Sequence, residues 1–200
     1  MAEYIDLHIH TDRSDGLQTP RQVVDRALEL GIKAVSITDH DAVSGFSEAA
    51  AYAQGKGVET ISGIELSAST DSEDDIHILG YLFSPDDECL VETLEKFRRF
   101  RVERGKKMVE RLADIGLKID YDDVLEKAGD ATIGRPHLAE IMVKEGVVQS
   151  YTEAFNRYLY LGGPVYVPKA KLNPVEAIQL LRSRLEKSHT NAEFLLSMKF

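Results

Sequence analysis

The sequence contains a single cysteine, Cys89, and this scarcity excludes several kinds of protein. One thiol can form neither an internal disulfide framework nor a zinc site built from cysteines. No apolar stretch approaches the roughly 20 residues that span a bilayer. The N-terminus also lacks the basic residues and the apolar run of a signal peptide, so we expect a cytoplasmic protein with no membrane partner.

Positive charge is also in short supply, because 24 Lys and Arg residues stand against 34 Asp and Glu residues, a net charge of −10. This balance argues against a broad surface for duplex DNA. Basic residues nevertheless gather between Glu92 and Arg111, which favours a small anionic ligand over a long polyanion. The alternative is a solvated helix face on which Glu and Arg pair at helical spacing.

With 200 residues, 43% of them hydrophobic, the chain is long enough for one sizeable domain with a core. Apolar runs alternate with amphipathic segments over residues 1–85. The expected elements are a strand at 4–9, a helix at 20–30, a strand at 33–38, a helix at 44–54 and strands at 59–64 and 76–83. This alternation is typical of an α/β fold with a parallel sheet.

The alternation stops at residue 86, and the block 86–162 looks like an inserted helical cap. Its predicted helices cover residues 90–116, 121–127, 136–144 and 151–161. In residues 163–182 the strand–helix pattern resumes with a short strand at 165–168 and a helix through Leu181. Residues 183–200 form an atypical tail in which no convincing strand is expected.

Six polar residues stand near the ends of the predicted strands: His8, His10, Asp15, His40, Glu65 and His77. Two histidines two residues apart in a strand point to the same side. Mixed imidazoles and carboxylates suit zinc, manganese or iron, and Glu65 could bridge two ions because it has two oxygens. Clustered divalent ions activate water and neutralise phosphoryl charge, as metal phosphoesterases require.

Several residues in these segments could instead have purely structural roles. Asp15 is also an ordinary turn residue before Gly16. Asp39 and Asp41 could orient His40 from behind, or they could cap the helix that follows.

Four segments in this order resemble the motifs of the PHP (polymerase and histidinol phosphatase) family. They are Asp6-Leu-His-Ile-His-Thr with Ser14-Asp15-Gly16, Ser36-Ile-Thr-Asp-His40-Asp, Gly63-Ile-Glu65 and Ile76-His77-Ile-Leu-Gly80-Tyr. Two later segments, Gly134-Arg-Pro-His137-Leu-Ala and Gly163-Pro-Val-Tyr-Val-Pro168-Lys, resemble one branch of that family. Its members are nucleoside 3′,5′-bisphosphate phosphatases that also act as 5′→3′ exoribonucleases on short RNA.

The resemblance implies a distorted β/α barrel of seven strands that holds up to three divalent ions. One ion would be held by His8, His10 and Glu65, a second by Glu65 and His77, and a third by Asp15 with His40. The catalytic residues would be Asp15, His40 and Glu65, acting through a water activated by the metals. The residues that would contact the substrate are Arg99, Arg101, Arg135, His137 and Lys169.

One departure from the family pattern concerns the C-terminal part. The family completes its metal shells with the histidine of a His-Pro motif and with an Asp-x-His pair near the C-terminus, and the C-terminal part of this sequence contains neither. We therefore expect a C-terminally incomplete barrel whose open edge could lead to self-association. Alternatives to the active phosphoesterase are an impaired metal- or nucleotide-binding fragment and another PHP phosphatase, such as histidinol phosphatase.

Overall fold

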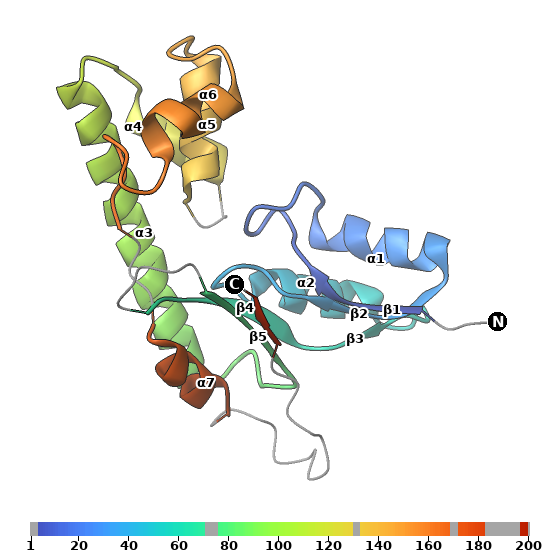
Figure 1. Ribbon diagram of the computed structural model, residues 1–200. Helices are drawn as coiled ribbons and strands as arrows, with labels where there is room; N and C mark the ends of the chain where they lie inside the picture. The colour runs from blue at the N-terminus through green and yellow to red at the C-terminus, as the bar shows by residue number, and fades with distance from the viewer. Residues whose placement is uncertain (1–3, 71–75, 130–132, 169–171, 183–196, 200) are drawn as a thin grey trace. The chain divides into compact units, whose positions relative to one another are not determined.

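The computed structural model describes residues 4–70, 76–129, 133–168, 172–182 and 197–199 (Figure 1). The chain divides into two compact units. The first comprises residues 1–95 and 171–200, and the second comprises residues 96–170. The chain therefore leaves the first unit once and returns to it.

The first unit begins with a parallel sheet and two crossover helices. Its elements are β1 (Tyr4–Ile9), α1 (Pro20–Leu30), β2 (Ile32–Ile37), α2 (Ser44–Ala53) and β3 (Glu59–Thr60), with the strand order β1-β2-β3. Helix α1 begins at a capping box between Thr19 and Gln22 and ends at Gly31, whose φ of 69° favours glycine. The predicted helices and the parallel crossovers in this region are confirmed.

Apolar side chains of α1, β2 and α2 form the core of this part. The buried members are Val23, Val24, Ala27, Val35, Ile37, Ala49, Ala53 and Val58. Their spacing follows one face of each helix, which is the stripe that the sequence pattern predicts. This core holds the ends of β1 and β2 at the same edge of the sheet.

The second sheet of the first unit is antiparallel, and here the expectation of a parallel sheet is wrong. It consists of β4 (Gly63–Ala68), β5 (Ile76–Tyr81) and β6 (Ser197–Lys199), in the order β4-β5-β6. Parallel neighbours need a crossover of a dozen or more residues, and only residues 69–75 connect β4 to β5. Such a short connection forces the chain to turn straight back.

The predicted strand over 59–64 is in fact two strands, because β3 ends at Thr60 and β4 begins at Gly63. A Cβ on Gly63 would lie 2.0 Å from Ser36 Oγ, so only glycine allows this close passage. As a result Glu65 lies inside β4 and not at a strand end. An isolated parallel bridge from His40 to Glu65 joins the two sheets, and the described strands do not close into a barrel.

Two further expectations about the later part of the chain are wrong. Residues 165–168 form no strand, and Val165 and Val167 instead pack into the core of the second unit. In the tail, where no strand was expected, β6 pairs with β5. Three residues are too few to show a periodic pattern, so sequence alone could not reveal β6. Helix α7 (Pro174–Arg182) lies in the first unit, and its Leu181 packs against Gly80 of β5.

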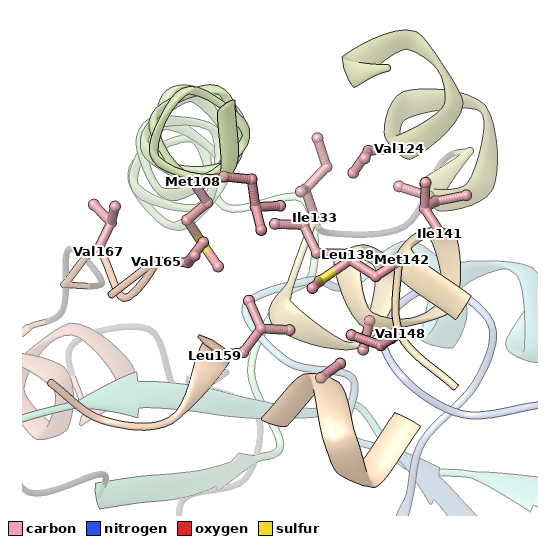
Figure 2. Packing of buried hydrophobic residues seen from close by; sticks show 14 residues of the cluster. Met108, Val124, Ile133, Leu138, Ile141, Met142, Val148, Leu159, Val165 and Val167 are labelled. Atoms are coloured by element: carbon pink, nitrogen blue, oxygen red, sulfur yellow. The ribbon is translucent and has the colours of Figure 1, made fainter. Parts of the chain in front are cut away.

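The second unit is helical. It contains α3 (Glu88–Asp114) from residue 96 onward, α4 (Tyr121–Ala128), α5 (Arg135–Lys144), α6 (Tyr151–Ala154) and the π-helical turn η1 (Phe155–Leu159). Figure 2 shows Met108 of α3, Val124 of α4 and Leu138 of α5 in one apolar cluster with Leu159 and Val165. The helices predicted in this block are confirmed. Among the described helices, none combines the length and apolar content that crossing a bilayer requires.

We expect the replacement Leu138→Ala to lower the free energy of unfolding by about 2–5 kcal/mol, because it opens a cavity in this core. Leu138 is fully buried in the cluster. The matched control is Leu125→Ala on α4, where the side chain is 38% exposed, and a loss below about 1 kcal/mol is expected. Urea unfolding followed by circular dichroism measures both, and equal losses would contradict the packing shown in Figure 2.

Candidate metal centre

The end of β1 places two imidazoles side by side. The Nε2 atoms of His8 and His10 lie 3.1 Å apart, so the two side chains point to the same side of the strand, as predicted. Both face Glu65 of β4, whose Oε2 lies 3.3 Å from His8 Nε2 and 2.9 Å from His10 Nε2. A first group of three donors therefore forms where the two sheets meet.

The loop after β1 and the end of β2 form a second group. Asp15 Oδ1 lies 3.3 Å from His10 Nδ1, and Asp15 Oδ2 lies 3.6 Å from His40 Nε2. His40 follows β2, and its bridge to Glu65 keeps it beside β4. Asp15 thus returns over the strand end in the way the sequence predicts.

A third group comes from the antiparallel pair β4–β5. His77 stands opposite Ser67 in the register, and Glu65 is two residues from Ser67 on the same face, so the two side chains are diagonal neighbours. His77 Nδ1 lies 3.1 Å from Glu65 Oε1, and His40 Nδ1 lies 3.5 Å from Glu65 Oε2. The two oxygens of Glu65 therefore face different imidazoles.

Each of the three groups, namely His8–His10–Glu65, His10–Asp15–His40 and His40–Glu65–His77, could hold an ion, because its donor atoms all lie within 4.8 Å of one another. Atoms that bind one ion at about 2.1 Å lie roughly 3–4 Å apart. The individual donor pairs described above are separated by 2.9 to 3.6 Å. Within the described residues, the buried His40 Nδ1 also has no hydrogen-bond partner. A buried polar atom of this kind is costly, and a bound ion would satisfy it.

The structure thus brings all six predicted donors together. The predicted set of His8, His10 and Glu65 appears as one group. The predicted pair of Glu65 and His77 gains His40, and the predicted pair of Asp15 and His40 gains His10.

The pKa values show how strongly these groups interact. Burial raises the pKa of Glu65, but hydrogen bonds with His10 and His77 and the charge of His40 outweigh burial and hold this pKa well below its ordinary value. Burial lowers the pKa of His10, but the hydrogen bond with Glu65 and the charges of Glu65 and Asp15 raise it by more. The pKa of His10 is therefore raised above 6.5. The pKa of His40 is lowered to about 4, chiefly because burial disfavours the imidazolium. At neutral pH the site therefore offers a carboxylate and a neutral His40, which are the forms that bind metal.

Neither of the two aspartates beside His40 occupies the N-cap position of α2. The N-cap of α2 is Val43, which has no side-chain cap bond. Asp39 instead accepts hydrogen bonds from the loop after β1, and Asp41 accepts one from Ser67 N at 2.8 Å. Sequence reasoning missed the loop partners of Asp39, because a threonine and a serine in a polar turn carry no distinctive signal.

Arg135, predicted to contact substrate, begins α5 in the second unit. Its Nη1 donates to Leu159 O at 3.0 Å. Its guanidinium carbon lies 5.7 Å and 6.0 Å from the ring centroids of Phe155 and Tyr166. These contacts give Arg135 a structural role in its own unit.

The other basic residues predicted to bind substrate differ in their settings. His137 is buried, and its Nδ1 accepts a hydrogen bond from Gly134 N at 3.1 Å, which completes the start of α5. On α3, Arg99 is exposed and Arg101 is half-buried. Lys169 lies outside the described residues.

Comparison with known proteins gives consistent matches. Residues 6–100 match the family described as PHP domain. The 3′,5′-nucleoside bisphosphate phosphatase of Chromobacterium violaceum is 35% identical over 164 residues, which are 82% of this chain and 57% of that protein. A 5′-3′ exoribonuclease of Haemophilus influenzae is 32% identical over 167 residues, 84% of this chain and 60% of that protein.

A solved structure of a metal-dependent phosphoesterase from Bifidobacterium adolescentis superposes with a TM-score of 0.81 at 33% identity, over 92% of this chain and 65% of that one. This chain therefore spans less than two thirds of each of these three proteins. The matched region contains every donor of the centre, in the order of the family motifs. Residues 6–100 of this chain therefore form a PHP domain.

Proposed function

We propose that this chain is a metal-dependent phosphoesterase that acts on nucleoside 3′,5′-bisphosphates or on the 5′ end of short RNA. The observation that carries this proposal is the set of three overlapping donor groups, two of which share one buried carboxylate, Glu65. The names of the relatives supply the substrate class.

The proposed ligands are the six residues of the three groups: His8, His10, Asp15, His40, Glu65 and His77. Nitrogen and oxygen donors of this mixture suit manganese, zinc or iron. Glu65 belongs to two groups, and its two oxygens face different histidines, so it is the natural bridge between two ions.

Divalent ions bound in such a centre neutralise charge on phosphoryl oxygens and lower the pKa of a water molecule. The chain's own residues would fix the positions of the metal donors and accept the proton of the attacking water. Glu65 and His40 are largely buried and keep fixed positions, whereas the Asp15 side chain is 47% exposed. Asp15 can therefore meet solvent and substrate, and its carboxylate is the group best placed to take a proton from the attacking water.

We further propose that residues 86–162 form a cap on a distorted seven-stranded β/α barrel of the kind the family resemblance implies. The residues proposed to contact substrate phosphate are Arg99, Arg101, Arg135, His137 and Lys169. Support comes from the local excess of basic residues in an acidic chain and from the resemblance around Gly134. The cytoplasmic location and self-association stay predictions from the sequence.

A second candidate is a metal- or nucleotide-binding protein with little turnover. The observation that favours it is the number of donors, because six residues must serve three ions that each prefer four or more ligands. Other positions would then be filled by solvent, and weaker metal binding would limit activity. Turnover with and without metal separates the two candidates.

We expect Glu65→Gln to lower bound zinc or manganese at least tenfold, because it removes the charged donor that two groups share. Elemental analysis of protein dialysed against limiting metal measures this loss. The control is Glu59→Gln on β3, which makes the same change at an exposed site and should retain the metal content of the unaltered chain. Equal metal content in both variants would rule out Glu65 as a ligand.

Metal affinity should rise with pH and level off above the pKa of His10. An imidazole binds metal only without its proton, and neighbouring carboxylates raise the His10 pKa above 6.5. His40, with a pKa of about 4, is already neutral over this range and adds no dependence. Calorimetric titration with Mn²⁺ between pH 5.5 and 8 should therefore show weaker binding at the acid end. An affinity that does not change with pH would contradict this assignment.

Phosphate release from adenosine 3′,5′-bisphosphate should appear when Mn²⁺ is added and disappear after complete metal removal. The centre has no other group that would activate water as strongly as a divalent ion does. A colorimetric phosphate assay measures the reaction, with adenosine 5′-monophosphate as the comparison substrate. Full activity in metal-stripped protein would contradict the proposed metal-dependent mechanism. Metal binding without any turnover would favour the second candidate.

A further inference from the structure

His40 stands between two buried aspartates that hold different segments of the first unit. Asp39 is fully buried and Asp41 is 6% exposed. Asp39 Oδ1 accepts hydrogen bonds from Thr11 N and Ser14 Oγ, and its Oδ2 accepts one from Thr11 Oγ1, each at 2.7 Å. Thr11 and Ser14 belong to the loop that runs from His10 to Asp15. One carboxylate just after β2 thus fixes the path of a loop whose two ends carry proposed ligands.

Asp41 and the backbone hold the other side of His40. Asp41 Oδ1 accepts a hydrogen bond from Ser67 N at 2.8 Å, and Asp41 N donates to Glu65 O at 3.0 Å. Glu65 N in turn donates to Asp39 O at 3.3 Å. The segment from Asp39 to Asp41 therefore links the loop after β1 to strand β4.

The fold leaves no spare space around the Asp39 carboxylate. Gly45 of α2 lies against it, and a Cβ at this position would stand 2.1 Å from Asp39 Oδ2 and 2.9 Å from Thr11 Oγ1. Contacts this short force Asp39 or the helix to move. The carboxylate is therefore held by three donors on one side and by a helix backbone on the other.

Asp39 does not belong to any of the three donor groups, although it is next to His40 in the chain. Its oxygens already accept three short hydrogen bonds, which satisfy a buried charge that would otherwise be costly. Ser14 Oγ, which donates to Asp39, also lies 3.5 Å from His10 Nδ1. The carboxylate therefore acts on the centre through the loop and not as a ligand.

We propose that Asp39 is a positioning residue that sets the spacing of His10, Asp15 and His40 through its hydrogen bonds to Thr11 and Ser14. This inference rests on the proposed function, because it assumes that those three residues bind an ion. Residues that orient metal ligands from behind typically contribute 10–100-fold to metal affinity. Asp39 should contribute on this scale to the affinity for the ion held by His10, Asp15 and His40. It should contribute much less to the affinity for the ion held by His40, Glu65 and His77.

The test is a Co²⁺ titration of metal-free protein, followed by absorption spectroscopy and by the stoichiometry of bound ion. Asp39→Ala should weaken the binding of one Co²⁺ ion by 10–100-fold and leave the rest of the binding curve unchanged. Asp39→Asn keeps the size and one acceptor oxygen, so it should recover part of this loss. Ser14→Ala removes one hydrogen-bond donor to Asp39 and should weaken the binding of the same ion. Gly45→Ala, which adds one methyl group and no charge, should act in the same direction.

The matched control is Ser44→Ala, an exposed position beside Gly45 on α2, which should leave the titration unchanged. Melting temperatures of the metal-free proteins show whether each variant is folded. If Asp39→Ala does not fold, Ser14→Ala and Asp39→Asn decide the question. Folded variants whose Co²⁺ affinity, spectrum and stoichiometry match the unaltered chain would overturn the inference, since a purely structural role lowers only the melting temperature. If the unaltered chain itself binds no Co²⁺, the proposed function fails first.

Discussion

The carboxylate of Glu65 is buried where two sheets meet, and the neighbouring strands of the first unit place imidazoles that compensate its charge. A lone buried charge costs several kcal/mol, but the Glu65 oxygens face four imidazoles from three other strands or strand ends. The parallel bridge to His40 and the antiparallel pairing with β5 deliver those imidazoles. The same arrangement keeps the carboxyl ionised, so the site carries a negative charge that divalent cations can neutralise.

The division of labour between the two units follows from their chemistry. Every donor of the candidate centre comes from the first 77 residues, and these donors lie on strands or in the segments that follow β1 and β2. Rigid strands suit this task, because metal ligands must be held to within fractions of an ångström. The second unit has its own helical core, and two of its arginines, Arg104 and Arg135, donate hydrogen bonds to backbone carbonyls within that unit. It can therefore fold around its own apolar cluster while the first unit forms the centre.

Membership in the family and the details of function rest on different evidence. The order of the motifs supports the family, and their convergence on one site gives a set of donors that could hold metal ions. Substrate choice also depends on groups outside the candidate centre, which meet the rest of the substrate. Two relatives named for different activities are 35% and 32% identical to this chain over the aligned residues, so family membership alone does not fix the substrate.

The sequence by itself predicted the candidate metal donors and most helices, because these depend on residue type and local periodicity. Histidines two residues apart on a strand and a capped amphipathic helix are readable without knowing the fold. Only the tertiary structure decided that β4 runs antiparallel to β5, that Glu65 lies within a strand and that β6 completes the sheet, because these follow from pairing between distant segments. The role of Asp39 was also hidden, since its partners Thr11 and Ser14 become neighbours only when the loop after β1 folds over the end of β2.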